Sequence, residues 1–235
     1  MSDPLAQRLS GPGYAFVPGT RMRQLLDGFK PLMDWNRFAD SWDDLVMDNH
    51  MADQGRYRKR RHAVYSVSAA GAIERQPHQP HFQAIDYNPL NGGIERMFEP
   101  VREDVGKGPT MKSILGWCGQ IFGELRPDTD WHVEVHQFRI EAQGFLVGKP
   151  TPEGMHHDGV DYVLVLLLQR RNIDSGTTMI GDDEQGFFAS FTLTEPFDSA
   201  LIDDRRVFHG VTPVKANDPG RPGHRDVLVV TFKRK

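Results

Sequence analysis

A wholly apolar segment at residues 163–168 follows directly on a histidine-rich stretch, and this pairing constrains the fold more than any other feature of the sequence. An apolar run that short, introduced by Gly159, is typical of a buried strand and cannot span a membrane. Side chains alternate along extended backbone, so His156 and Asp158 are expected on one face and His157 on the other. At roughly 6–7 Å apart, His156 and Asp158 could bind one metal ion between them.

An imidazole and a carboxylate are two of the three ligands in the facial triad of non-haem Fe(II) oxygenases, and the remaining ligand is a second histidine. His209 is the candidate, because it lies in a predicted strand at residues 207–211 and the turn residues Gly210 and Pro213 follow it. About three predicted strands separate Asp158 from His209, enough to return the chain to the same end of a β-sandwich. Three protein ligands leave metal positions open for substrate and oxygen.

Arg225 begins the last predicted strand, at residues 225–232. A buried arginine requires an anionic partner, and its guanidinium is suited to binding a carboxylate through two parallel hydrogen bonds. Two alternatives stay open. One is a structural ion pair between Arg225 and Asp226, and the other is a carboxylate site at Arg221, whose loop at residues 219–223 would hold it less rigidly.

The first half of the chain is mainly helical in pattern and the second half mainly extended. Apolar residues recur at helical spacing at residues 21–30, 38–51, 94–101 and 109–126. Alternating or wholly apolar segments predict strands at residues 63–67, 132–140, 162–168, 177–180, 187–193, 201–202, 207–211 and 227–232. Residues 1–19 are expected to form an extended lead-in or a short edge strand.

No internal repeat or low-complexity linker marks a domain boundary, so residues 1–235 are expected to form a single domain. In it, residues 1–130 would be largely helical support and residues 131–235 would supply most of the strand core. This order predicts a mainly β protein in which N-terminal helices pack on a β-sandwich.

Composition excludes several classes of function. The net charge of −4 and the isoelectric point near 6.2 give no basis for binding nucleic acid or an anionic membrane. The N-terminus lacks the regions of a signal peptide, and Cys118 is the lone cysteine, so no intrachain disulfide is possible. We therefore expect a cytoplasmic protein in a reducing compartment, which would also suit ferrous iron. The oligomeric state stays open.

Several motifs together are similar to those of a known family. The pattern of His156-x-Asp158, His209 and Arg225 resembles that of Fe(II)/2-oxoglutarate-dependent dioxygenases with a double-stranded β-helix (jelly-roll, cupin-like) core. The segments HQFRI, EGMHHDG, GTT, HGVTP and RDVL resemble the BsmA-like and L-isoleucine dioxygenase-like branch, at residues 136–140, 153–159, 176–178, 209–213 and 225–228. The resemblance covers most of the chain and is strongest from about residue 131 onward.

This resemblance implies that His156, Asp158 and His209 bind Fe(II) and that Arg225 binds the distal carboxylate of 2-oxoglutarate. Thr151 could donate its hydroxyl to 2-oxoglutarate, with a plain turn residue as the alternative. The implied reaction consumes oxygen and 2-oxoglutarate, releases succinate and carbon dioxide, and hydroxylates a small substrate such as a free aliphatic L-amino acid. Two other functions stay open: a cupin-like zinc or manganese hydrolase or isomerase, and a non-catalytic metal- or small-ligand-binding protein of a stress response.

Other charged and imidazole side chains have structural interpretations. Arg139 could bind a substrate carboxylate or support the sheet, and the basic residues 56–61 are expected on a solvated face, although one of these arginines could contact the substrate. His132 and His136 alternate with valines, which predicts polar positions on a strand about 13 Å apart rather than a helical zinc motif. Two further histidines are expected on the surface of a loop, His78 and His81.

Overall fold

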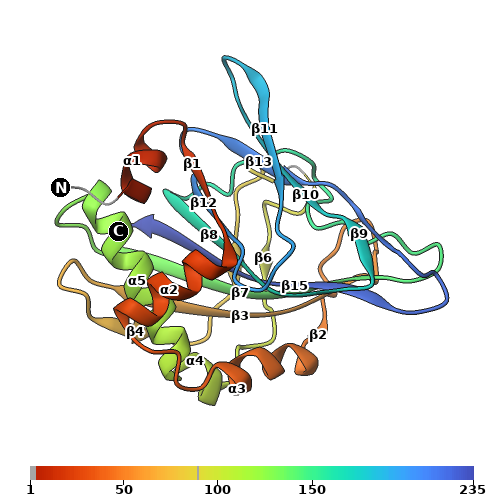
Figure 1. Ribbon diagram of the computed structural model, residues 1–235, viewed down its shortest axis with the longest axis horizontal. Coiled ribbons are helices and arrows are strands. Elements are labelled where there is room, and N and C mark those ends of the chain that lie inside the picture. Colours follow the sequence, from red (N-terminus) through yellow and green to blue (C-terminus); the bar gives the residue numbers. More distant parts are fainter. Residues whose placement is uncertain (1–3, 89) are drawn as a thin grey trace.

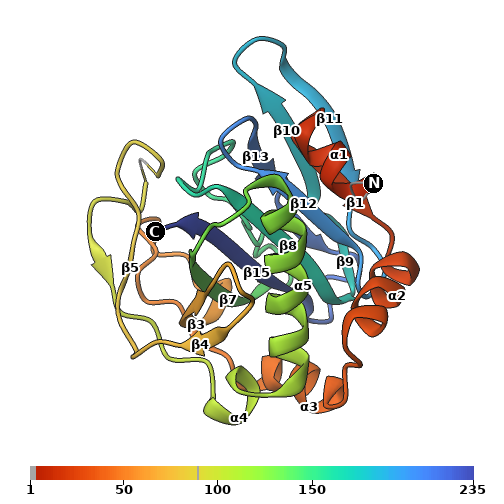
Figure 2. The ribbon, with the colours of Figure 1, turned by 90° about the vertical axis from the view of Figure 1, so that its left-hand side faces the viewer.

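The computed structural model describes residues 4–88 and 90–235. Its helices are α1 (Pro4–Ser10), α2 (Gly19–Phe29), α3 (Trp35–Asp40), the 3₁₀ helix η1 (Ser41–Asp44), α4 (Glu103–Gly106) and α5 (Pro109–Leu125). They gather on one face of a large antiparallel sheet (Figures 1 and 2). No helix in the described part of the chain is long and apolar enough to cross a membrane.

The large sheet contains strands from both halves of the chain. They are β1 (Tyr14–Val17), β2 (Val46–Met47), β3 (Arg58–Val67), β4 (Ile73–Arg75), β7 (Trp131–Ala142), β8 (Tyr162–Arg171), β12 (Ser199–Asp203) and β15 (Gly223–Arg234). The order across the sheet is β1-β12-β8-β15-β7-β3-β2, with β4 paired to β3. β3 pairs with β7 along its whole length, so the first 130 residues contribute more strand than the largely helical support that the sequence predicts.

Three smaller sheets complete the fold. One has the order β11-β10-β13 and is formed by β10 (Thr177–Asp182), β11 (Gly186–Thr192) and β13 (Phe208–Val211). The others pair β9 (Ile173–Ser175) with β14 (Val214–Ala216), and β5 (His81–Phe82) with β6 (Glu95–Arg96). All of the strands predicted in the second half are present, and the predicted sandwich of antiparallel sheets with N-terminal helices is confirmed.

The apolar segment at residues 163–168 lies in β8, which is buried on both faces. Leu164 and Leu166 join the core beneath α2 and α5, whereas Val163 and Val165 join the core formed with β10 and β11. A strand covered on both faces gains from apolar residues at every position, which explains the continuous run. The same two-sided covering fixes the register of β8, because a slip by one residue would exchange the faces.

Two helix predictions need correction. Over residues 38–51 the helix ends early: α3 and η1 stop at Asp44, and Val46, which is exposed, pairs with β3 instead. Residues 94–101 contain no helix, because β6 pairs with β5 there. Ile94 and Met97 are exposed while Phe98 is buried, so the helical spacing does not form a buried stripe. The predictions that became α2 and α5 are confirmed.

Candidate metal centre and adjoining cavity

The predicted metal ligands come together, but two of them lie in a loop. β8 begins only at Tyr162, so His156 and Asp158 precede the strand on which alternation was expected. Instead of lying along one strand with Asp158, His156 is joined to His209 by a single antiparallel bridge. The backbone groups of His156 and His209 exchange two hydrogen bonds of 2.9 Å. His209 itself lies on β13. The bridge holds the two imidazole rings side by side, with centroids 4.7 Å apart.

His156, Asp158 and His209 form a compact donor set. Each offers one ligand atom, and these atoms lie within 4.8 Å of one another. The Nε2 atoms of the two histidines lie 3.4 Å and 3.5 Å from the Asp158 carboxylate. Nδ1 of His156 lies 3.1 Å from the Gly154 carbonyl and donates to it, so Nε2 is the nitrogen that faces the other two residues. Two imidazole nitrogens and a carboxylate oxygen are the donors that suit Fe(II).

Charge at these residues favours a cation between them. Burial alone would raise the pKa of Asp158, but the hydrogen bond from His156 and the imidazole charges hold it below its ordinary value. Burial acts to lower the pKa of His156, and Asp158 and Glu153 outweigh it and raise this pKa to about 9. Burial and the charge of His156 lower the pKa of His209 to about 4. A buried carboxylate that stabilises positive charge on its neighbour would stabilise a divalent cation in the same way.

Asp204, a residue that the sequence motifs did not indicate, supports the loop. Its carboxylate accepts hydrogen bonds from three successive backbone N–H groups, those of Asp158 (2.9 Å), Gly159 (2.8 Å) and Val160 (3.1 Å). Burial and the charge of Asp158 raise the pKa of Asp204 to about 7. His157 donates through Nδ1 to the Asp204 carbonyl, and so faces away from the metal ligands as expected.

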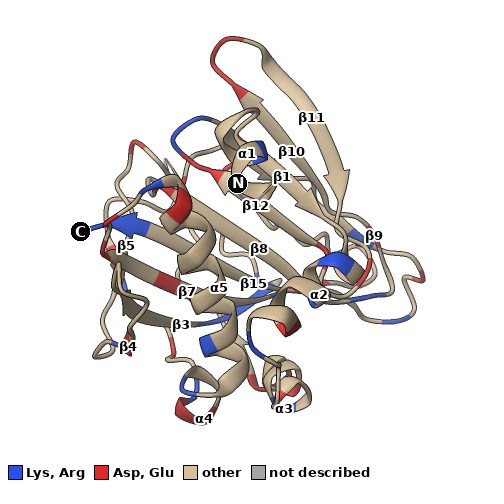
Figure 3. Cartoon of the chain, turned by 60° about the vertical axis from the view of Figure 1, so that its left-hand side comes forward, with Lys and Arg blue, Asp and Glu red and all other residues tan. Residues whose placement is uncertain are grey.

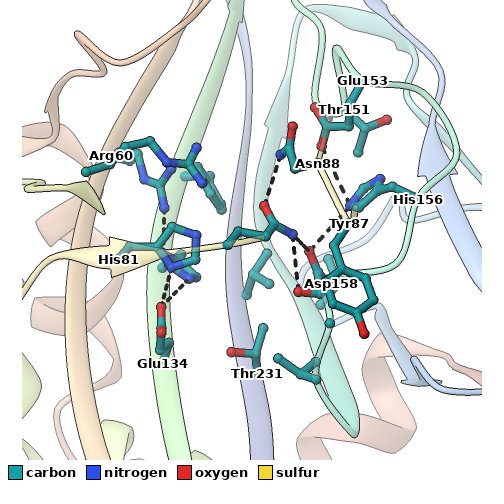
Figure 4. A pocket seen from close by; sticks show the side chains of 18 of the residues that line it. Arg60, His81, Tyr87, Asn88, Glu134, Thr151, Glu153, His156, Asp158 and Thr231 are labelled. Atoms are coloured by element: carbon teal, nitrogen blue, oxygen red, sulfur yellow. Dashed lines mark hydrogen bonds and ion pairs between the residues drawn. The ribbon is translucent and has the colours of Figure 1, made fainter. Parts of the chain in front are cut away.

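A cavity of about 440 Å³ adjoins the donor set (Figure 4). Its lining includes His156, Asp158, His209 and Arg225, together with valines of the large sheet. Thr151 also lines it, but the Thr151 hydroxyl already binds β13. Its oxygen accepts from the Val211 N–H at 2.9 Å and donates to the Val211 carbonyl at 3.2 Å. Thr151 therefore connects the loop to β13 and has no free hydrogen for a ligand.

Arg225 is buried in the cavity wall and forms no ion pair or hydrogen bond with the described residues. It is 2% exposed, and its Nε and Nη2 atoms have no hydrogen-bond partner among the described residues. Burial and the charge of Arg170 lower the pKa of Arg225 to about 10. Asp226 instead accepts two hydrogen bonds from Arg139, of 2.8 Å and 2.7 Å. Asp226 is therefore the partner of Arg139 and not of Arg225, and Arg139 supports the sheet. The alternative carboxylate site, Arg221, is exposed and lies outside the cavity.

A second imidazole cluster lies across the cavity, where Figure 4 shows His81 and Glu134 opposite His156 and Asp158. The Glu134 carboxylate accepts a hydrogen bond from His62 at 3.0 Å and another from His81, and it lies 3.6 Å from His136. His81 is therefore not on the surface of a loop as expected. His132 and His136 lie on a strand as predicted, but they also contact Glu134. These contacts depend on β3 and β5 lying against β7, which no local pattern indicates.

The basic residues 56–61 do not form a solvated face. Figure 3 marks charged residues of both signs within the large sheet, and both β7 and β15 contain basic and acidic residues. Arg58 and Arg60 of β3 are buried and line the cavity. Arg58 forms an ion pair of 2.7 Å with Asp48, and Arg60 lies over the ring of Phe98, 3.5 Å from its centroid.

The comparisons with known proteins agree with this geometry. Residues 39–231 match the model of a family described as 2OG-Fe dioxygenase. The chain is 23% identical over 238 residues to 3(1)-hydroxy-L-isoleucine 4-dioxygenase of Pantoea ananatis, and the aligned region covers 97% of this chain and 95% of that protein. It is 25% identical over 159 residues to L-isoleucine-4-hydroxylase of Bacillus thuringiensis, which covers 66% and 65%.

A solved structure extends this similarity to the whole fold. The crystal structure of a BsmA homologue from Methylobium petroleophilum PM1 has a TM-score of 0.88 and 35% sequence identity to this chain, over 97% of this chain and 91% of that one. The family match, the fold and the His–Asp–His donor set therefore agree with the motifs in the sequence. This chain belongs to the 2OG-Fe dioxygenase family, whose chemistry uses Fe(II), 2-oxoglutarate and oxygen.

Proposed function

We propose that this dioxygenase hydroxylates a free L-amino acid and releases succinate and carbon dioxide. The observation that carries the proposal is one cavity lined both by a compact His–Asp–His donor set and by a buried guanidinium without a partner. A guanidinium in that state requires a carboxylate, and 2-oxoglutarate would provide one. A cavity of about 440 Å³ is within the size range of sites that bind small molecules.

The roles of the site residues follow from this proposal. His156, Asp158 and His209 would bind Fe(II), and Arg225 would bind the distal carboxylate of 2-oxoglutarate. The bound iron, with oxygen and the oxoacid, supplies the oxidising power to hydroxylate a C–H bond. The protein would orient both ligands and exclude water with its apolar wall, which includes Val165, Val227 and Val229. Thr151 could contact 2-oxoglutarate only by giving up its bond to the Val211 carbonyl.

The substrate class rests on the relatives. Two of them carry names that state an isoleucine or a hydroxyisoleucine as substrate, and both are dioxygenases or hydroxylases. We extend the class, a free aliphatic amino acid, to this chain. We also propose that residues 1–235 form one domain, since helices from the first half cover a sheet built by both halves, and that the protein works in the cytoplasm, where ferrous iron and the lone buried Cys118 would stay reduced.

The test is succinate production by protein loaded anaerobically with Fe(II) and then given 2-oxoglutarate, oxygen and each of the twenty amino acids. We expect one or a few aliphatic amino acids to raise succinate, with a matching gain of one oxygen atom in the amino acid. Asp158→Ala should abolish both products. A hydrolase or isomerase with the same ligands would form no succinate and would not depend on Arg225. A non-catalytic binding protein would bind iron and 2-oxoglutarate without turnover, and either result would refute the proposal.

A further inference from the structure

The cavity contains more positive charge than its own residues neutralise. Three arginines line it in addition to Arg225, and they are Arg58, Arg60 and Arg96. Asp48 forms an ion pair of 2.7 Å with Arg58 and lies 3.6 Å from Arg60. Arg60 also donates a hydrogen bond of 2.7 Å to Nδ1 of His136. Arg58 and Arg60 therefore have partners within the fold.

Arg96 forms no ion pair or hydrogen bond with the residues that the structure describes. It lies on β6 and is only 2% exposed, and its Nε and Nη2 atoms are buried without a hydrogen-bond partner among the described residues. An unpaired guanidinium in a buried wall is costly unless a ligand completes it. Arg225 is in the same state, so the cavity presents two guanidinium groups that form no ion pair or hydrogen bond among the described residues, and so has positions for two carboxylates. 2-Oxoglutarate would occupy only the one at Arg225.

Glu153 is the opposite case, a buried carboxylate with a free oxygen. Its side chain is 8% exposed, and its Oε2 atom has no hydrogen-bond partner in the described part of the chain. Its Oε1 atom forms an ion pair of 3.6 Å with Nε2 of His156, so Oε2 is the oxygen left for a ligand. The charge of Glu153 acts on that of Arg96, yet the two side chains form no ion pair in the described structure. A cation and an anion line one cavity without contacting each other.

The Glu134 cluster does not offer an equivalent position. Both of its carboxylate oxygens already lie near imidazole nitrogens, Oε2 near His62 and His81 and Oε1 near His132. A carboxylate with these donors in place has little capacity left for a ligand. Glu134 therefore orients the imidazoles, and Glu153 is the carboxylate of the cavity whose Oε2 atom has no hydrogen-bond partner in the described part of the chain.

We propose that Arg96 binds the α-carboxylate of the substrate amino acid and that Glu153 binds its α-ammonium group. This inference rests on the proposed function, since it assigns the residues that recognise the substrate named there. The two charged groups of an amino acid are attached to one carbon, so one ligand could contact both Arg96 and Glu153, which line the same cavity and whose charges act on each other. Recognition of both charges would leave the side chain of the substrate to the apolar wall and would make an amino acid bind more tightly than the corresponding amine or simple acid.

The test measures ligand binding without turnover. Calorimetric titrations use protein loaded with Ni(II), which binds such donor sets tightly, and 2-oxoglutarate. The three probes are L-isoleucine, 2-methylbutylamine, which lacks the carboxylate, and 3-methylpentanoic acid, which lacks the ammonium group. Arg96→Gln should weaken binding of L-isoleucine and 3-methylpentanoic acid by about 10- to 100-fold and leave the amine unchanged. Glu153→Gln should weaken L-isoleucine and the amine by a similar factor and leave the acid unchanged.

Arg225→Gln is the matched control, because it removes the other unpaired guanidinium of the same cavity. Arg225→Gln should weaken the binding of 2-oxoglutarate, whereas Arg96→Gln and Glu153→Gln should leave that binding unchanged. Arg96→Lys, which keeps the charge but not the planar fork, should restore part of the L-isoleucine affinity. Thermal unfolding of each variant reports whether it is folded, and Arg96→Gln should not unfold at a lower temperature than the wild type, since it removes an uncompensated buried charge.

Three results would overturn the proposal, and a fourth would contradict only the proposed function. Equal weakening of all three probes by Arg96→Gln would mean that Arg96 only supports the cavity wall. If Arg96→Gln instead weakened the binding of 2-oxoglutarate, Arg96 would be a residue that binds the cosubstrate. If none of the twenty amino acids binds while succinate still forms, recognition of an amino acid fails but the dioxygenase chemistry stands. If amino acids bind as expected but no succinate forms, the binding residues are correct and the proposed function is wrong.

Discussion

The carboxylate of Asp204 holds the backbone of Asp158, because its Oδ1 atom accepts a hydrogen bond of 2.9 Å from the Asp158 N–H group. Two further backbone N–H groups of the same loop donate to Asp204. Groups that orient a metal ligand in this way typically contribute a factor of 10 to 100 in metal affinity. Asp204→Ala should therefore weaken metal binding by about that factor, which competition with a coloured chelator would measure.

Asp198 provides a matched control for Asp204. It is also buried, and its carboxylate also accepts three backbone hydrogen bonds, from Gly19 (2.7 Å), Thr194 (2.9 Å) and Glu195 (3.0 Å). None of these groups belongs to the metal-binding loop. Asp198→Ala should destabilise the fold but leave the dissociation constant of the metal unchanged. Equal losses of metal affinity in both variants would show that the effect of Asp204 is a loss of general stability.

The buried charge of Arg225 should destabilise the ligand-free protein. Burial that lowers the pKa of Arg225 from 12.5 to about 10 corresponds to a penalty of roughly 3 kcal/mol on the charged form. Arg225→Met keeps most of the apolar stem and removes the charge, so we expect the free energy of unfolding of the ligand-free protein to rise by about 1–3 kcal/mol. The same variant should bind 2-oxoglutarate about 10- to 100-fold more weakly.

Arg139, on the neighbouring strand β7, should show the opposite effect, because its removal should lower the free energy of unfolding. Its guanidinium binds both carboxylate oxygens of Asp226, which is 1% exposed. Arg139→Met would remove both hydrogen bonds to that buried carboxylate and leave it with His224 at 3.6 Å, so the free energy of unfolding should fall by about 3–5 kcal/mol, with no change in 2-oxoglutarate affinity. Urea denaturation of both variants measures the two signs. A loss of stability in Arg225→Met would show that Arg225 has a partner within the fold.

Asp48 should make stability depend on acid pH. Burial acts to raise the pKa of Asp48, but the charges of Arg58 and Arg60 outweigh it and hold this pKa below its ordinary value. A carboxyl group whose pKa is lowered by folding contributes stability above its unfolded pKa, and that contribution disappears as the pH falls through the folded value. Asp48→Asn should be about 3–5 kcal/mol less stable than the wild type at neutral pH.

The difference between the wild type and Asp48→Asn should therefore narrow as the pH falls below about 4, as Asp48 becomes protonated in the wild type. Urea denaturation from neutral pH to about pH 3 would measure it. Asp43→Asn is the control, since the Asp43 side chain is 78% exposed and pairs only at the surface with Arg139. A difference that stays constant across this range would mean that the charge of Asp48 contributes no stability.

The parts of the site that the sequence predicted are those whose signals are local. His156, Asp158 and His209 lie beside a buried strand and a turn, and Arg225 lies near the start of a strand whose following segment, residues 227–230, is apolar. The structure brings all four to one cavity. Local patterns also predicted α2, α5 and the strands of the second half, because each buries a face or stripe of its own residues.

The remaining parts depend on which distant segments pack together. His62 contacts Glu134 only because β3 and β7 pair in the register that places His62 opposite His136. Arg96 lies in a segment predicted as a helix, and its position in the cavity wall results from the pairing of β6 with β5. The spacing of apolar residues cannot indicate such contacts, since tertiary packing overrides local preference there.

The last prediction concerns the number of metal ions. The described residues contain two groups that could hold an ion, the one at His156 and the one formed by His62, His81, Glu134 and His136. In the second group, Arg60 donates a hydrogen bond of 2.7 Å to Nδ1 of His136. A guanidinium can only donate, so Nδ1 is an acceptor and Nε2 of that neutral ring carries the hydrogen and offers no lone pair to a metal. The positive charge of Arg60 would also repel a divalent cation.

We therefore expect one Ni(II) or Fe(II) ion per chain in calorimetric titration, and none in Asp158→Ala. Glu134→Gln should still bind one ion with the affinity of the wild type, because Glu134 only orients imidazoles across the cavity. Arg60→Gln tests whether the positive charge of Arg60 prevents metal binding at the cluster. An amide can reproduce one hydrogen bond to His136, but it does not repel a cation. If the wild type bound two ions and Glu134→Gln lost one of them, the cluster would be a second metal site and the structural role assigned to Glu134 would be wrong.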